Sequence, residues 1–340
     1  MRVLILAAIL VVAGVAVGAT PVNAQAPTRE RLSTDALDVV PPSTRVSGAA
    51  GSLTVRETGC RRMSGEPLRR RIVDVAAQEW GFFGFSLVDQ TRLDEQPTAR
   101  GRSRRPRLSP VESARVADSI AGYWTVTPEG GWIIEHQNQR WDGSAGSARW
   151  RTPWSAAFVS WVMCESGLVE SHRFQRAVAH HTYIDQAIRA RDAGAGPAAF
   201  TAYDIGETEI LPGDLLCSGR RPAYGSLAER RRQMGEGART HCDVVVALDE
   251  AHGRILTIGG NVRGTVSLKV VPAVLEPGVG LRPHGGARPL FAHLKLRADP
   301  IESDALGESP TIRAITCTGG PAHARLAANH VVAPTNAARC

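Results

Sequence analysis

The chain has 340 residues, which is enough for one or two domains with a full hydrophobic core. Its 40 Lys and Arg residues outnumber 33 Asp and Glu residues, giving a formal net charge of +7. No nucleic-acid recognition motif and no basic stripe interleaved with aromatic residues accompanies this charge, so we discount nucleic acid as a partner.

The N-terminus has the pattern of a signal peptide. Arg2 precedes an apolar run from Val3 to about Gly18, and Val22-Asn23-Ala24 resembles a cleavage site for a signal peptidase. The alternative is a membrane anchor, but the run is short for a bilayer span and ends in a polar segment that contains proline. We therefore predict a signal peptide over residues 1–24. The mature protein is expected to be exported to the periplasm or the cell exterior, with no membrane attachment.

Export makes disulfide bonds possible. The six cysteines are Cys60, Cys164, Cys217, Cys242, Cys317 and Cys340. Their number permits pairing, but the sequence alone leaves the connectivity open. None of them forms a C-x-x-C motif, so we predict neither a zinc site nor any other metal or cofactor.

The first part of the mature chain changes character near residue 66. Residues 25–65 are rich in Pro, Ser, Thr, Gly and Arg, and we predict a loosely ordered lead-in there. Apolar residues at helical spacing predict a helix over 67–80 and a second one over 109–123, which Ser109 would cap. The arginine-rich segment 100–107 is expected to be a solvated loop.

Residues 152–164 predict a buried helix. Thr152 can cap it, and Pro153 suits its first turn, where a missing N–H group has no cost. The apolar stripe consists of Trp154, Ala157, Phe158, Trp161 and Val162. Ser155 then lies in the first turn, where unpaired N–H groups and the helix dipole favour negative charge. This position suits a nucleophile, and it is equally a common place for an ordinary serine.

The second half of the domain changes from helix to strands. A helical pattern over 171–193 precedes five predicted strands at 211–217, 241–247, 254–258, 265–271 and 291–296. Residues 259–261 predict a tight turn. We expect an α+β domain over residues 66–296, with N-terminal helices packed on a small antiparallel sheet. Residues 297–340 are expected to be an extended or disordered tail.

Four short motifs follow one another in this domain. They are Pro153-Trp154-Ser155-Ala156-Ala157-Phe158, Gly213-Asp214-Leu215-Leu216, His241-Cys242-Asp243-Val244-Val245 and Gly259-Gly260-Asn261. Their order resembles that of the papain-like cell-wall hydrolases of the NlpC and CHAP group. Within that group, the chain is most similar to a bacterial family known only as domain of unknown function 2272. The resemblance covers roughly residues 70–271 and implies a papain-like fold.

The resemblance also implies a catalytic site. Ser155 occupies the position at which the group has its cysteine nucleophile, His241 would take the nucleophile's proton, and Asn261 would orient the imidazole. A serine hydroxyl needs a well-placed base, whereas a cysteine is partly ionised near neutral pH. Cys164 cannot substitute, because nine residues rotate a helix by about 900°, onto the opposite face. Cys242 neighbours His241 on a strand and therefore points to the other side of the sheet.

Each of these residues also has an ordinary structural interpretation. Ser155 alone suits a helix start, His241 a strand edge, and Asn261 a turn with positive φ. Asp214 is expected to cap the turn before its strand. His180 and His181 are expected on a helix surface or in the core, although one could face the cleft. The resemblance makes the strands of Cys217 and Cys242 antiparallel neighbours, which implies a disulfide between them.

Three functions remain open. The resemblance implies an exported amidase or endopeptidase that acts on peptidoglycan, its expected partner, through Ser155, His241 and Asn261. The alternative is a catalytically inactive domain of the same fold that binds cell-wall peptides or a partner protein. A serine hydrolase of small amides or esters is the third. The sequence does not reveal the oligomeric state or the bond that is cleaved.

Overall fold

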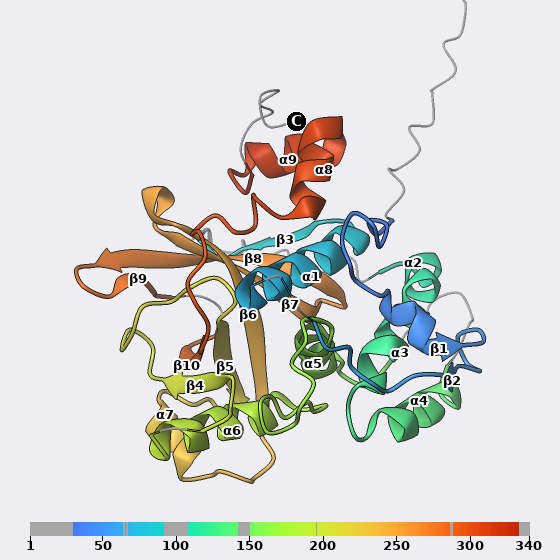
Figure 1. Ribbon diagram of the computed structural model, residues 1–340, viewed down its shortest axis with the longest axis horizontal. Helices are drawn as coiled ribbons and strands as arrows, with labels where there is room; N and C mark the ends of the chain where they lie inside the picture. The colour runs from blue at the N-terminus through green and yellow to red at the C-terminus, as the bar shows by residue number, and fades with distance from the viewer. Residues whose placement is uncertain are drawn as a thin grey trace, which may run out of the picture.

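The computed structural model describes residues 30–63, 65, 67–91, 108–141, 150–194, 196–285 and 288–332. The predicted signal peptide and the basic loop at 100–107 lie outside these ranges. Within the described residues, helices cover a large mixed sheet, which confirms the α+β class (Figure 1). None of the described helices is both long enough and apolar enough to cross a bilayer.

The strands of the sheet lie in the order β3-β8-β7-β6-β5-β10-β4, and β9 pairs with the C-terminal end of β8. Its strands are β3 (Ser86–Asp89), β4 (Phe200–Tyr203), β5 (Leu215–Arg221), β6 (Arg239–Asp249), β7 (Arg254–Val262), β8 (Thr265–Glu276), β9 (Gly280–Pro283) and β10 (Leu290–Leu296). Only β3 runs parallel to its neighbour among these described pairs. The sheet is therefore mainly antiparallel, as the consecutive strand patterns predict.

The helices surround this sheet on the side of the main core. They are α1 (Leu68–Phe82), α2 (Pro110–Arg115), α3 (Ala117–Thr125), α4 (Gly130–Asn138), α5 (Ser155–Glu165), α6 (His180–Asp192), α7 (Leu227–Arg231), α8 (Pro310–Thr318) and α9 (Pro321–Ala328). Helices α1 and α5 pack on β6 and β7, and α6 packs on β4 and β6. Helices α2 to α4 lie beyond α5, beside the short helix η1 (Pro42–Arg45) and the small hairpin of β1 (Val46–Ser47) and β2 (Thr54–Val55) (Figure 1).

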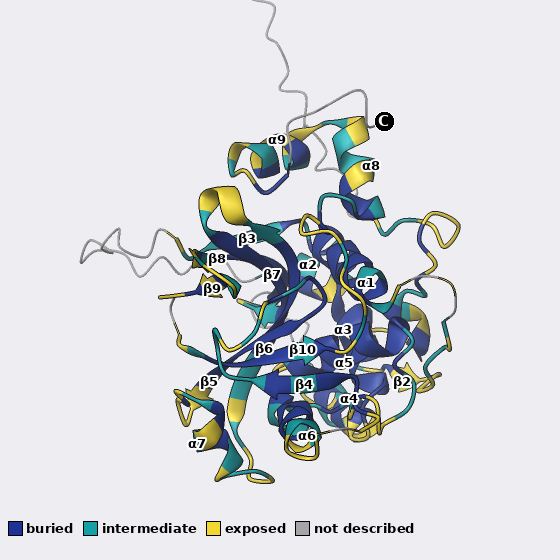
Figure 2. Ribbon diagram, turned by 60° about the vertical axis from the view of Figure 1, so that its left-hand side comes forward, coloured by how far each residue is buried: buried dark blue, intermediate teal, exposed yellow. Residues whose placement is uncertain are grey.

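The centre of the structure is α5, which is buried along almost its whole length (Figure 2). Tyr123 of α3 packs on its aromatic side chains, with ring centroids 5.8 Å from Trp154, 5.5 Å from Phe158 and 5.3 Å from Trp161. Aromatic rings bury large areas and pack in specific geometries, so they fix the helix firmly. The first turn of α5 is thereby held in place against the sheet.

Helix α5 approaches β7 closely because Gly260 has no side chain. A Cβ atom at this position would lie 2.5 Å from the Cβ atom of Phe158, which is fully buried. Real Cβ atoms do not approach other carbon atoms this closely, so a larger residue would push the helix away from the strand.

We therefore expect Gly260→Ala to lower the free energy of unfolding by about 1–3 kcal/mol, the usual effect of overpacking a core. Chemical denaturation monitored by circular dichroism measures this change. Gly131→Ala is a matched control, because Gly131 lies within α4 and a Cβ atom there meets nothing within 4 Å. The control should be neutral or slightly stabilising. Equal stability of both variants would contradict the close packing.

Several predicted boundaries differ from the structure. Helix α5 begins at Ser155 without a side-chain cap, because the Thr152 hydroxyl accepts a hydrogen bond from Gln137 Nε2 at 2.7 Å instead. The helix predicted over 109–123 is divided at Val116, although Ser109 does cap its start. The helix predicted over 171–193 begins only at His180. Strand β7 continues through the predicted turn at 259–261 and ends at Val262.

The two flanking segments are more ordered than their composition predicts. The lead-in is tied to α5 by a disulfide between Cys60 and Cys164, which no sequence pattern indicated. It is also held by an ion pair of 2.6 Å between Arg61 and the buried carboxylate of Glu165. The predicted tail contains α8 and α9, and their buried Ile312 and Leu326 join the main core. The contacts of the lead-in leave no periodic signal in that segment, whereas Ser309 and Pro310 start α8 as Ser109 and Pro110 start α2.

The other two structural predictions for single residues are confirmed. Cys217 and Cys242 are Cα partners on β5 and β6 and form a disulfide with a Cα–Cα distance of 4.1 Å. Asp214 is buried and structural. Its carboxylate accepts hydrogen bonds from the backbone N–H of Leu211 at 3.0 Å, from Arg69 at 2.7 Å and from His293 at 2.7 Å.

Candidate functional site

Ser155 is the first residue of α5 and is only partly buried. The residue before it supplies no side-chain cap, so the first N–H groups of the helix are not bonded to a capping side chain. These groups carry the positive end of the helix dipole. The Ser155 hydroxyl therefore lies where developing negative charge is stabilised.

The Ser155 hydroxyl contacts His180, the first residue of α6. The distance from His180 Nε2 to Ser155 Oγ is 2.7 Å. On the other side of the ring, Nδ1 accepts a hydrogen bond from the backbone N–H of Cys242 at 3.2 Å and also contacts the Tyr183 hydroxyl. A backbone N–H group can only donate, so Nδ1 carries the lone pair and Nε2 carries the proton.

His180 is therefore a donor to Ser155 and not a base for it. Burial is the main cause that lowers the pKa of His180 well below its usual value, and the charge of His241 lowers it further. Burial also raises the pKa of Tyr183 well above its usual value, which keeps that hydroxyl protonated. The neutral His180 ring holds Ser155 Oγ as an acceptor and leaves the serine's own proton free to point at another group.

A second histidine, His241, belongs to a different network. Its Nε2 lies 2.9 Å from Oδ1 of Asp243, whose Oδ2 accepts a hydrogen bond of 2.6 Å from Lys269 Nζ. Asp243 is 6% exposed, and its pKa is far below the usual range because the charges of Lys269 and His241 outweigh the cost of burial. The ionised carboxylate fixes the ring proton of neutral His241 on Nε2. Nδ1 of His241 is then the nitrogen with a free lone pair.

The geometry of the strands explains how this network forms. His241 and Asp243 are two residues apart on β6 and share one face of the sheet, while Cys242 faces the main core. Lys269 lies on β8, on the far side of β7 from β6. Gly259 of β7 lies between them, and a Cβ atom there would come within 1.8 Å of Asp243 Oδ1. The missing side chain at Gly259 thus lets the carboxylate reach across the strand to Lys269.

The pKa of His241 is lowered by its surroundings. Burial is the largest cause, the charge of Asp243 opposes it, and the charges of Lys269 and Arg288 lower the pKa further. We expect an NMR titration of the His241 ring protons to give a pKa below the usual value of about 6.5. Arg288→Gln removes one positive charge and should move that pKa upward. A pKa above 6.5 in the unaltered protein would contradict this environment.

The two networks meet in one cavity of about 730 Å³. Ser155, His180, His241, Asp243 and Lys269 all line it. The rings of the two histidines are adjacent, with centroids 5.2 Å apart. A serine at a helix N-terminus and a histidine oriented by a carboxylate therefore face the same space.

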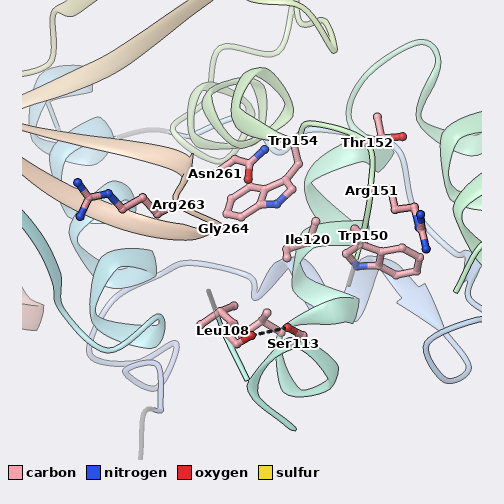
Figure 3. Close-up of a pocket in the computed structure, with 11 residues that line it drawn as sticks. Leu108, Ser113, Ile120, Trp150, Arg151, Thr152, Trp154, Asn261, Arg263 and Gly264 are labelled. Carbon is pink, nitrogen blue, oxygen red and sulfur yellow. Dashed lines mark hydrogen bonds between the residues drawn. The ribbon is translucent and has the colours of Figure 1, made fainter. Parts of the chain in front are cut away.

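Asn261 lies at the boundary between this cavity and a second one of about 480 Å³. Its φ of 54° is in the left-handed region, which asparagine tolerates better than most residues. Figure 3 shows the second cavity, where Asn261 lies beside Trp154 and the guanidinium group of Arg263 points away from Trp154. Both residues line both cavities, so the β7–β8 turn separates the two spaces.

The structure thus brings the three predicted residues, Ser155, His241 and Asn261, to one cavity. It does not bond Ser155 to His241, since Ser155 contacts His180, and the carboxylate of Asp243, not Asn261, holds the His241 ring. Sequence reasoning missed the role of Asp243. The available signal was a histidine and an aspartate two residues apart on one strand, because such a pair shares a face.

His180 and Lys269 were also missed. His180 was expected on a helix surface or in the core with the cleft as an alternative, and it is buried at the cavity wall. Lys269 is one of the two lysines in the chain. Among the residues that the structure describes, no group of three or more His, Cys, Asp or Glu side chains is placed to hold a metal ion.

Comparisons with known proteins identify a family and leave its activity open. No curated protein and no solved structure matches the chain. One family model matches residues 113–286, just over half of the chain, and this span contains the whole network from Ser155 to Lys269. The chain belongs to the family described as "Uncharacterized protein conserved in bacteria (DUF2272)".

Proposed function

We propose that this protein is an exported hydrolase with a papain-like fold of the NlpC and CHAP type, which cleaves amide bonds in peptidoglycan with Ser155 as nucleophile. The observation that supports it most is the shared cavity of Ser155 and the His241–Asp243–Lys269 network. A nucleophile at a helix start and a histidine held by a carboxylate are the parts that covalent acyl transfer requires.

In the first step, Ser155 Oγ attacks the carbonyl carbon of the scissile amide. Its proton passes to Nδ1 of His241, the nitrogen that the bond to Asp243 leaves free. His180 keeps Oγ in place by donating from Nε2. The backbone N–H groups of the first turn of α5 would stabilise the oxyanion of the tetrahedral intermediate.

In the second step, the carbon–nitrogen bond breaks and His241 returns the proton to the leaving amine. The product is an ester between Ser155 and the acyl group. Water then attacks this ester while His241 accepts a proton from it. The bond between the carbonyl carbon and Ser155 Oγ breaks, His241 returns the proton to Oγ, and the carboxylic acid leaves. The carboxylate of Asp243 offsets the positive charge that His241 carries between these transfers.

Digestion of purified sacculi tests the proposal. The mature protein at about pH 8, where His241 is neutral, should release soluble fragments whose new amino and carboxyl ends mass spectrometry identifies. A fluorophosphonate probe should also label Ser155, because it reacts with activated serine hydroxyls. If the protein at this pH releases no fragments and the probe does not label Ser155, the proposed activity is contradicted.

One observation favours a second candidate, a catalytically inactive domain that binds cell-wall peptides or a partner protein. The Ser155 hydroxyl is hydrogen-bonded to His180, which cannot act as its base in the tautomer that the backbone N–H of Cys242 requires. Binding of the protein to sacculi in a pelleting assay, without release of fragments, would support this candidate.

A further inference from the structure

The catalytic cavity is surrounded by positive charge. Four exposed arginines line it, namely Arg220, Arg239, Arg263 and Arg288. Among the described residues, none of their side chains forms a hydrogen bond or an ion pair within the protein. A single exposed arginine is ordinary, but four guanidinium groups without a partner among the described residues are gathered around one cavity, where they can bind an anionic ligand.

The sheet brings three of these arginines to the same place. Arg220 lies near the end of β5, and Arg239 opens β6 as the Cα partner of the neighbouring Arg221. Arg288 stands two residues before Leu290, which pairs with Ser218, and Arg220 stands two residues after Ser218. Arg220 and Arg239 on the adjacent strands β5 and β6, and Arg288 just before β10, therefore lie at about the same height along the strand direction.

The fourth arginine lies elsewhere on the cavity wall. Arg263 belongs to the β7–β8 turn, has a left-handed φ of 57° and lines the second cavity as well (Figure 3). Positive charge therefore enters the cavity from the ends of three adjacent strands and from a separate turn.

The described lining of the cavity offers no free negative charge to balance these groups. Among the described residues that line it, Asp243 is the only acidic one, and Lys269 and His241 already pair with it. The positive charge of Arg288 acts on a group in the cavity wall, because it contributes to lowering the pKa of His241. Clefts lined by charge of one sign concentrate ligands of the opposite sign.

We infer that the cavity binds an acidic peptide, with carboxylates placed on Arg220, Arg239 and Arg288 beside the bond that Ser155 attacks. The position of that bond rests on the proposed function, and the binding of the peptide does not. Guanidinium groups bind carboxylates in a bidentate manner. A carboxylate-bearing peptide fits this arrangement better than a nucleic acid does, because the arginines are grouped around one cavity instead of forming a long surface stripe.

A matched pair of peptides tests this inference by isothermal titration calorimetry. The acidic probe is acetyl-Glu-Ala-Glu-amide, and the neutral probe is acetyl-Gln-Ala-Gln-amide. The full mature chain should bind the acidic peptide about tenfold or more tightly at low ionic strength, and this preference should shrink as salt screens the charges. Equal affinities for the two peptides, or tighter binding of a ten-residue oligothymidylate, would overturn the inference.

Variants locate the binding site. Arg220→Gln and Arg239→Gln should each weaken binding of the acidic peptide by about two- to fivefold, the range of a partly exposed ion pair, and leave the neutral peptide unaffected. Arg140→Gln is the control, because Arg140 is exposed and lines neither cavity. A loss of the same size in Arg140→Gln would show that the net charge, and not the cavity, attracts the peptide.

The result is separable from the proposed function. Preferential binding of the acidic peptide without release of fragments from sacculi would support the inference while contradicting the hydrolase. Release of fragments without any preference between the two peptides would overturn the inference and leave the hydrolase intact.

Discussion

Replacing Ser155 by alanine is expected to lower the rate of amide hydrolysis by about 10⁴- to 10⁶-fold, as removal of the attacking group does in serine hydrolases. The variant keeps His180, His241 and Asp243 in place, because none of their mutual contacts passes through the hydroxyl. Release of fragments from sacculi measures the rate. Unchanged activity in Ser155→Ala would remove Ser155 from the mechanism.

The variant Ser155→Cys separates an active serine site from one that has lost its activity. A thiol at the start of α5 has a lowered pKa, since a helix N-terminus favours the thiolate. If the unaltered protein is inactive and Ser155→Cys releases fragments, the protein is the non-catalytic binder. If both release fragments, the hydrolase is supported. Ser309→Ala is the control, because Ser309 caps α8 away from the cavity and its loss should leave the rate unchanged.

The parts of the fold that follow from local pattern were predictable. The apolar run of β6 and the alternating residues at the start of β8 predict strands, and the position of Cys242 opposite His241 follows from the period of two. The lead-in was not predictable, because distant partners hold it, whereas α8 begins with Ser309 and Pro310, a helix-start signal that sequence reasoning missed. Arg61 is fixed by Glu165, and Leu326 is buried in the main core. Composition describes a segment alone and contains no information on such contacts.

In the candidate site, the residues that line the cavity were predictable, but the contacts between their side chains were not. Motif order placed Ser155 and His241 together, and both line the cavity. The choice of Asn261 as the orienting group followed the resemblance, while the actual contact is a hydrogen bond of 2.9 Å from His241 to Asp243. That contact depends on Gly259, whose missing side chain gives the carboxylate its space. The role of His180 depends on the tautomer that the backbone of Cys242 imposes, which only the folded geometry defines.

The second large effect is expected for Asp243→Asn. Lys269 can only donate hydrogen bonds, so the amide oxygen of the new side chain must face Lys269 Nζ. The amide NH₂ group then faces Nε2 of His241, which has to accept and moves its ring proton to Nδ1. This is the nitrogen that would take the proton of Ser155. We expect the rate of hydrolysis to fall by about 10³- to 10⁴-fold, the effect of a wrong histidine tautomer in a related constellation.

A double variant tests this explanation. In Asp243→Asn/Lys269→Met the amide is free to turn, because methionine donates no hydrogen bond, and the amide oxygen can again accept from His241 Nε2. The double variant should therefore be about tenfold or more faster than Asp243→Asn alone. Nitrogen chemical shifts of the His241 ring report the tautomer independently of the rate. A double variant no faster than the single one, with the proton still on Nδ1, would contradict the control of His241 by Lys269 through residue 243.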